Sequence, residues 1–169
     1  MGKVVTNDGG GRARVRGCVL ASASVLSLAV MCAAAKAQPS GGSVVAGSAQ
    51  ISSSGATTLI NQSTSKAIIN WQSFSVAPGS TVQFNQPSAS AVTLNRVTGT
   101  SASVIDGAIR ANGQVWLLNP NGLLFGNGAT INVAGLLATT SDINDQDFLS
   151  GRYSFSSTGG KGAITNAGT

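Results

Sequence analysis

From Ile51 onward, apolar and polar residues alternate in short runs that are separated by Gly, Asn, Ser and Pro. Residues 81–85, 92–96 and 130–133 each carry Val, Leu, Ile or Phe at every second position, with mostly Thr, Asn or Gln at the others. A period of two is typical of strands that bury one face. The pattern therefore predicts short strands along most of the chain.

Two stretches depart from this alternation. Residues 115–118 are apolar at consecutive positions, which favours a strand at 114–118 that is covered on both faces. Residues 141–149 are expected to hold one helical turn, with Ser141 or Asp142 as its cap. After residue 37 no segment sustains a period of 3.6, so the sequence indicates an all-β protein.

The corners between the predicted strands are rich in Gly and Asn, which accept the left-handed conformations of tight turns. Very short strands with such corners favour a right-handed parallel β-helix (a β-solenoid), in which Asn and Thr side chains pair along the stack. At roughly 20 residues per coil, this predicts about six coils. Residues 38–50, rich in Gly, Ser and Ala, are expected to be a flexible lead-in to a domain at 51–169.

The first 37 residues have the three parts of a secretory signal peptide. A basic flank precedes an uncharged stretch at 18–35, and Ala35-Lys36-Ala37 forms a small-x-small site. Cleavage by signal peptidase is predicted between Ala37 and Gln38, after export by the Sec machinery. The alternative is a transmembrane anchor, since the stretch could just span a bilayer. The cleavage site favours the signal peptide, and we expect no stable membrane insertion.

Charge and cysteine content change once this segment is set aside. The chain has 10 Lys and Arg against 5 acidic residues and a net charge of +5. Half of the basic residues precede residue 38, and the remainder are scattered, which argues against nucleic-acid binding. Cys18 and Cys32 also lie before the cleavage site, so the exported part is expected to hold no disulfide.

The acid–base inventory argues against an enzyme. The chain has no His, and all of its acidic residues are Asp, which excludes a Ser-His-Asp triad, a His-ligated metal and a Glu base. Asp142, Asp145 and Asp147 form the densest acidic cluster; we interpret it as a solvated loop, with weak Ca²⁺ binding as the alternative. Asp106 is interpreted as a turn residue. We predict no catalytic residue, no cofactor and no metal.

Residues 119–122 read Asn-Pro-Asn-Gly and predict a β-turn after the strand at 114–118. Pro120 fixes φ near about −65° at the second turn position, and Gly122 suits the fourth. The Asn119 side chain can bond the backbone two residues on. On local physics alone this is a well-formed solenoid corner.

The stretch Asn119–Leu123 also resembles the NPNG(I/L) motif in the secretion domain of two-partner secretion exoproteins, the family of filamentous haemagglutinin and the high-molecular-weight adhesins. Three further segments resemble family segments in the same order. They are residues 69–74 (I-N-W-Q-S-F), residues 84–97 (F-N-Q-P … A-V-T-L-N-R-V) and residues 131–143 (I-N-V-A-G-L-L-A-T-T-S-D-I). The resemblance runs from about Gly47 to Thr169. The family's earlier NPNL turn is absent.

The resemblance implies a parallel β-helix with short extra β elements and an N-terminal cap. It implies export to the periplasm of a Gram-negative bacterium, where an outer-membrane TpsB-type transporter, a β-barrel with POTRA domains, recognises the domain for secretion or surface display. It also implies a role in secretion or in domain folding for Asn119, Pro120, Asn121, Gly122 and Leu123.

Family exoproteins are much longer, so we expect the C-terminal part of the domain to be missing here. The alternative function is a surface adhesin or haemagglutinin that binds host glycans directly. Trp71, Trp116 and Tyr153 are spread along the sequence, and we expect no aromatic sugar-binding platform.

Overall fold

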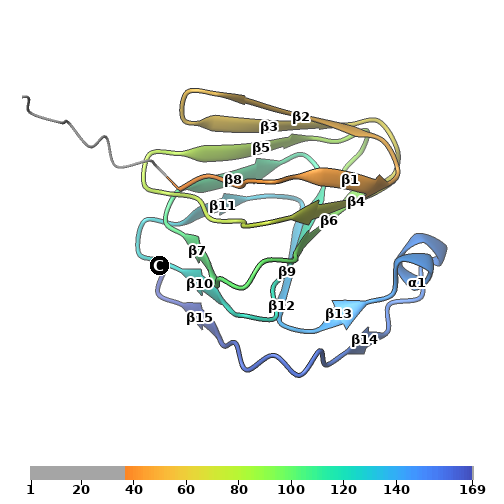
Figure 1. Cartoon of the computed structure of the whole chain (residues 1–169). Coiled ribbons are helices and arrows are strands. Elements are labelled where there is room, and N and C mark those ends of the chain that lie inside the picture. The colour runs from red at the N-terminus through yellow and green to blue at the C-terminus, as the bar shows by residue number, and fades with distance from the viewer. Residues whose placement is uncertain (1–36, 169) are drawn as a thin grey trace, which may run out of the picture. The chain divides into compact units, whose positions relative to one another are not determined.

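The computed structural model describes residues 37–168, so most of the predicted signal peptide, Ala35 included, lies outside the described residues. The described chain is almost entirely β-structure (Figure 1). Its elements are β1 (Ser43–Ala46), β2 (Ala49–Ser54), β3 (Thr57–Gln62), β4 (Lys66–Trp71), β5 (Thr81–Asn85), β6 (Val92–Val97), β7 (Ser103–Ile105), β8 (Ala108–Ala111), β9 (Gln114–Leu118), β10 (Leu123–Phe125), β11 (Thr130–Asn132), β12 (Gly135–Thr139), β13 (Asp142–Ile143), α1 (Asp145–Ser150), β14 (Phe155–Ser156) and β15 (Ile164–Asn166).

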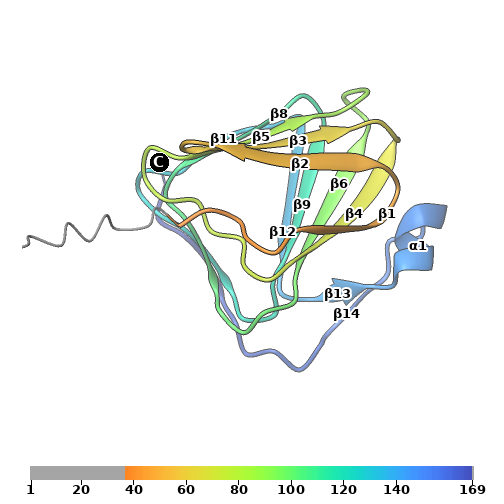
Figure 2. The ribbon, with the colours of Figure 1, turned by 45° about the horizontal axis from the view of Figure 1, so that its top comes forward.

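Most strands belong to three sheets that run along one stack. Sheet 1 has the order β1-β4-β6-β9-β12, sheet 2 the order β11-β8-β5-β3-β2, and sheet 3 the order β15-β10-β7. A coil contributes one strand to each sheet, as β5, β6 and β7 do, and the next coil adds its strands in parallel register. Figure 2 shows the three sheets around a common interior. The predicted right-handed parallel β-solenoid is confirmed.

The predicted number of about six coils is wrong. Sheet 2 contains four parallel strands, and successive coils meet at Thr57, Thr81, Ala108 and Thr130. Each coil is therefore longer than the roughly 20 residues assumed. In addition, β1 and β2 pair antiparallel with the stack, and residues 140–163 leave it before returning as β15.

The expected flexible lead-in at residues 38–50 is also wrong. β1 pairs antiparallel with β4, placing Val44 opposite Ile69, and β2 begins at Ala49 opposite Gln62. These strands form the N-terminal cap of the stack. The composition does not reveal these strands, because they carry few apolar residues on the inward face and mostly Ser, Val45 and Gln50 at exposed positions.

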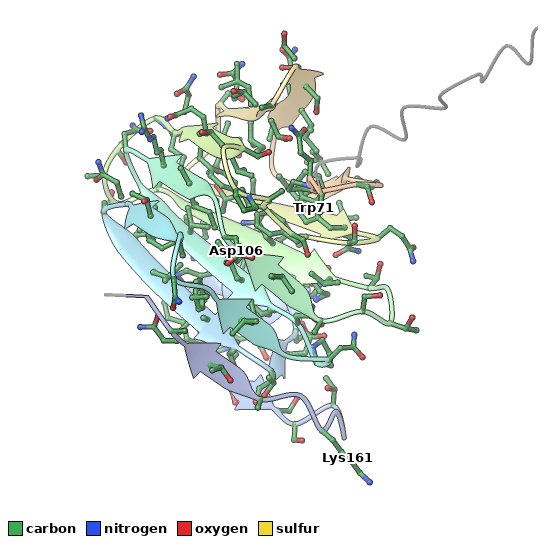
Figure 3. The ribbon with its side chains drawn as sticks, turned by 90° about the vertical axis from the view of Figure 1, so that its left-hand side faces the viewer. Trp71, Asp106 and Lys161 are labelled. Atoms are coloured by element: carbon green, nitrogen blue, oxygen red, sulfur yellow. The ribbon has the colours of Figure 1, made fainter. Side chains whose placement is uncertain are left out.

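The interior of the solenoid is one apolar core, which includes Ile60, Phe84, Ile109, Val115 and Leu123. Polar side chains pair along the stack on its outer surface, as where the exposed Asn85 side chain donates to Asn61 of the preceding coil at 2.8 Å. Such pairing along the stack is what the corner composition predicted. Figure 3 shows Trp71 toward the capped end of the stack and Lys161 at the opposite end.

Sheet 1 is apolar on both faces, as predicted for residues 114–118. Val115 and Leu117 point into the core, whereas Trp116 and Leu118 belong to a second buried cluster on the outside. In that cluster Trp116 lies in register beside Leu94, and Leu94 lies beside Ile68 of the coil before it. A segment comprising β13, α1 and β14, residues 142–156, closes the cluster from outside, with Phe148 fully buried. We call residues 142–156 the cover segment.

The cover segment contains the predicted helical turn, but its cap is different. α1 begins after Asn144, whose side chain accepts from the Gln146 backbone N–H at 2.9 Å, and not after Ser141 or Asp142. Asp142 is instead paired in β13. At the other end of α1, Lys66 Nζ donates to the Phe148 and Leu149 carbonyls at 2.8 and 3.0 Å. Among residues 37–168, no helix is long and apolar enough to cross a membrane.

Candidate functional site

The predicted secretion motif forms a corner between sheets 1 and 3, and Asn119 is its buried centre. The Asn119 Nδ2 donates to the Ser101 carbonyl at 3.0 Å and to Ser103 Oγ at 2.9 Å, both in the preceding coil. Its backbone N–H donates to the Thr139 carbonyl of the following coil at 3.0 Å. One asparagine therefore joins three successive coils.

The same side chain also closes the turn. Asn119 Oδ1 accepts from the Asn121 backbone N–H at 2.9 Å, which is the predicted bond to the backbone two residues on. The Gly122 N–H donates to the Asn119 carbonyl at 3.0 Å and completes the β-turn. Both donors of the Asn119 amide and its acceptor oxygen are thus used, as a buried polar group requires.

The turn lies directly against the coil that follows. Gly162 donates its backbone N–H to the Pro120 carbonyl at 3.2 Å, and Leu123 donates to the Ala163 carbonyl at 3.0 Å. Gly122 has a φ of 109°, which L side chains rarely adopt. A Cβ at Gly162 would overlap the Gly122 nitrogen, so the two glycines allow the backbones to stack.

The five motif residues differ in how much they offer to a partner. Asn119, Gly122 and Leu123 are buried, and Pro120 is half-buried. Asn121 is the one exposed member, and its Nδ2 donates to the Gly99 carbonyl at 2.8 Å. Most of the motif is therefore inaccessible to another protein in the folded domain.

The other family-like segments contact one another across the stack. Trp71, from the I-N-W segment, donates its indole N–H to Asn95 Oδ1 at 3.0 Å inside the protein. Asn95 belongs to the N-R-V segment and donates to the Trp116 carbonyl at 3.3 Å. The burial of both polar groups is offset by these bonds. Residues separated in the sequence therefore form one internal chain of hydrogen bonds.

Arg96, the residue after Asn95, connects β6 to the cover segment. Its guanidinium contacts Asp142 Oδ1 and Asp145 Oδ1, each at 2.8 Å, and Nη2 donates to the Ile143 carbonyl at 2.6 Å. Burial alone would lower the pKa of Arg96, but the hydrogen bonds and the charges of the two carboxylates outweigh it and raise this pKa. The cover segment is therefore fixed to β6 by a cation whose charge it neutralises.

Replacing Arg96 with methionine is expected to lower the free energy of unfolding by about 1–2 kcal/mol. Because methionine keeps the apolar stem, the lost free energy of unfolding reports the contribution of the guanidinium alone. The effect is moderate because both aspartates are partly exposed to solvent. Urea unfolding followed by tryptophan fluorescence measures it.

The matched control is Arg152→Met, because Arg152 pairs with Asp147 at 2.6 Å but its side chain is 70% exposed, against 14% for Arg96. Its expected cost is below about 0.5 kcal/mol. Equal costs for the two variants would contradict the assignment of Arg96 as the fastening residue.

The acidic cluster differs from its sequence interpretation. Asp142 and Asp145 are paired with Arg96, and Asp147 with Arg152, so these carboxylates are not simply solvated. Among residues 37–168, no three His, Cys, Asp or Glu side chains gather as a metal site would require. Asp106 lies at the corner after β7, as expected of a turn residue, and is labelled in Figure 3.

The aromatic residues are closer together than their sequence positions indicate. The rings of Trp116 and Tyr153 lie 4.8 Å apart, with Phe148 beside Trp116 at 5.4 Å. Trp71 belongs to the separate interior core. Trp116 and Tyr153, which are far apart in the sequence, therefore belong to one aromatic cluster. Of this outer cluster only Tyr153 has a half-exposed ring, so it does not form a flat multi-ring surface.

The residues on either side of the predicted cleavage bond contact the folded domain. The Ala37 carbonyl accepts from the Ala77 backbone N–H at 2.8 Å. Gln38 donates from Nε2 to the Gly55 carbonyl at 3.1 Å and accepts from Thr58 Oγ1 at 3.3 Å. Cleavage at this bond stays a prediction.

The residues that contact the turn at 119–122 are not predictable from the sequence. Ser101, Ser103 and Gly162 contact the turn and Lys66 caps α1, yet none of these four lies in a family-like segment. Thr139 lies in the family-like segment 131–143, but nothing in that segment indicates that its carbonyl accepts from Asn119. Their roles depend on which coil stacks on which, and this information lies in the register and not in local sequence. The one usable signal was the Gly-rich stretch at 159–162, since close backbone approach favours Gly.

The capped parallel solenoid and its Asn-Pro-Asn-Gly corner define a β-helical secretion domain as the class of this protein. A second finding gives the family. The chain belongs to the family of TPS secretion domains, whose family model matches residues 35–169. This is a family of secretion domains of exoproteins and not an enzyme family.

Individual relatives agree with this family. Two proteins of Haemophilus influenzae, each named a heme/hemopexin-binding protein, are 49% identical to this chain, one over 66% and the other over 57% of it. The matched regions are 12% and 10% of those proteins. The crystal structure of the HMW1 secretion domain from H. influenzae superposes with a TM-score of 0.73 at 37% identity, covering 77% of this chain and 35% of that one.

Proposed function

We propose that this chain carries the export address of a two-partner secretion exoprotein. After Sec-dependent export and signal-peptide removal, an outer-membrane transporter with POTRA domains and a β-barrel recognises it in the periplasm. The chain then passes through the barrel and starts β-helix folding outside the cell. The observation that carries the proposal is the family match over residues 35–169, which contains the whole Asn-Pro-Asn-Gly corner.

The sequence and the stack support passage as an extended chain. Charged residues make up 9% of the sequence, and both cysteines precede the predicted cleavage site, so little charge and no disulfide would hinder threading. An extended segment could pair its backbone with a strand edge of a POTRA domain. Because each coil pairs with the one before it, folding can proceed coil by coil as the chain emerges. The folding free energy would then favour outward movement.

Within this mechanism we assign Asn119 a folding role. Its bonds to the preceding and following coils can form only as those coils stack, and they fix the register of three coils at once. Asn121 is the motif residue that remains open to direct contact in the folded domain. The two asparagines therefore allow folding and recognition to be tested separately.

Dependence on the transporter is the direct test. The chain is expressed in a Gram-negative host with and without a cognate TpsB-type transporter, and periplasm and medium are assayed for the processed chain. We expect it in the medium only when the transporter is present, and in the periplasm otherwise. Release into the medium without the transporter, or none with it, would contradict the proposal.

A narrower function is not carried over from the relatives. The shared segment is 12% of the heme/hemopexin-binding protein, and this chain contains no His. We therefore do not propose heme or hemopexin binding for this chain. A direct adhesin role likewise gains no support, because the described surface lacks a flat aromatic platform of the kind that sugars stack on.

A further inference from the structure

The peptide bond predicted for cleavage, between Ala37 and Gln38, is part of the folded cap. The Ala37 carbonyl accepts from the Ala77 backbone N–H at 2.8 Å. On the other side of the bond, the Gln38 side chain donates to the Gly55 carbonyl, in the turn between β2 and β3, and accepts from the Thr58 hydroxyl on β3. Both sides of the bond are therefore tied to the domain.

The next two residues hold this segment more firmly. Pro39 is buried, and Ser40 forms an antiparallel bridge with Ser73. The Ser40 N–H donates to the Ser73 carbonyl and the Gln72 N–H to the Ser40 carbonyl, each at 2.9 Å. The hydroxyls of Ser40 and Ser73 lie 2.8 Å apart. Releasing residues 37–40 from the cap therefore breaks several hydrogen bonds and exposes a buried ring.

We propose that the folded cap blocks removal of the signal peptide, so that cleavage has to precede the folding of residues 37–40 onto the cap. This inference rests on the signal-peptide processing of the proposed function. Cleavage adds water across the amide bond: the bond breaks, hydroxide joins the Ala37 carbonyl carbon, and a proton joins the Gln38 nitrogen. The transition state places negative charge on the Ala37 oxygen, which a peptidase stabilises with its own donors. In the folded chain the Ala77 N–H already occupies this oxygen.

The order of the two events decides what becomes of the signal peptide. Cleavage of a folded chain proceeds through local openings, and its rate falls with their population. A chain that folds first is therefore expected to retain its signal peptide. In a chain that is cleaved first, only the Ala37 bond is lost, and the contacts of Gln38, Pro39 and Ser40 can still complete the cap.

The test is cleavage of the full chain, residues 1–169, by purified signal peptidase in detergent micelles. The chain is diluted from urea, and the peptidase is added after increasing delays. We expect the cleavage rate to fall by about tenfold or more once the chain has folded, with the same time course as the change in tryptophan fluorescence. Mass spectrometry is expected to identify Gln38 as the first residue of the product.

Two variants loosen the segment. Ala77→Pro removes the donor to the Ala37 carbonyl, and Pro39→Ala removes most of the buried ring. Protection is the ratio of the cleavage rate without delay to the rate after folding, and each variant is expected to lower it by about threefold or more. Pro87→Ala is the matched control, because Pro87 is exposed in the corner after β5, and it should leave this ratio unchanged.

Far-UV circular dichroism verifies that each variant folds, and the comparison of the unaltered chain before and after folding depends on neither. Equal cleavage rates before and after folding would overturn the proposal. So would protection that Pro39→Ala and Ala77→Pro both leave unchanged, since the block would then lie outside the cap, or cleavage of the unfolded chain at a different bond. The proposed export function is tested separately, by release that depends on the transporter.

Discussion

Replacing Asn119 with alanine is expected to lower the free energy of unfolding by about 3 kcal/mol and to reduce secretion severely. The substitution removes two donated bonds and leaves the Ser101 carbonyl and the Asn121 N–H without their partner inside the corner. Each buried polar group left unpaired costs about 1–3 kcal/mol. Urea unfolding of the purified variant measures the loss, and the amount of processed chain in the medium measures secretion.

Asn121→Ala is the matched control, since Asn121 has the same chemistry in the same turn but is exposed. It loses the bond to the Gly99 carbonyl and is expected to cost below about 1 kcal/mol, with secretion near normal. Loss of secretion in Asn121→Ala, with stability retained, would contradict a folding role and would assign recognition to the exposed face of the turn.

A second large effect is expected from Phe148→Ala, which should lower the free energy of unfolding by about 4 kcal/mol. Phe148 is fully buried between the cover segment and the outer face of sheet 1, and its ring meets Trp116 edge-on at 5.4 Å. Truncation leaves a cavity there and opens Trp116 to water. Urea unfolding measures the loss, and a red shift of tryptophan emission in the folded variant reports the opening.

Leu149→Ala provides the comparison for this change. Leu149 is the next residue of α1 but is 42% exposed, so its truncation is expected to cost below about 1 kcal/mol without a shift in emission. Similar losses at residues 148 and 149 would contradict the view that the cover segment completes a second core.

The two variants concern features that the sequence predicts to different extents. The turn at residues 119–122 and the doubly covered strand at 114–118 were predictable, because turn chemistry and hydrophobic period are local signals. The parallel solenoid followed from short strands and Gly- and Asn-rich corners. The identity of the partners of Asn119 was not predictable, since Ser101 and Thr139 meet it only through the stacking of coils.

The errors have the same physical origin. The composition of residues 38–50 predicts a flexible lead-in, because it does not reveal that β1 pairs antiparallel with β4 and β2 with β3, which partly buries their apolar residues. The acidic cluster reads as solvated in the sequence because the arginine that pairs with Asp142 and Asp145 is more than 40 residues away. The structure of the cap strands and of the cover segment depends on long-range register and charge pairing and not on local propensity.

Contacts among the family-like segments give them a common explanation. Trp71 bonds to Asn95, and the neighbouring Arg96 bonds to the segment that closes the outer cluster. Together with the Asn119 corner, these contacts fasten successive coils to one another. The family-like segments of this chain thus largely supply the contacts that hold successive coils of its solenoid together.

We propose that the Asn119 corner promotes secretion by stabilising the folded solenoid. The most direct test compares secretion of Asn119→Ala with that of Ile109→Ala, a core truncation in sheet 2 with a similar expected cost of about 3 kcal/mol. With the unfolding free energies of both variants measured, we expect equal loss of transporter-dependent secretion at equal stability. Normal secretion of Ile109→Ala beside failed secretion of Asn119→Ala would contradict it.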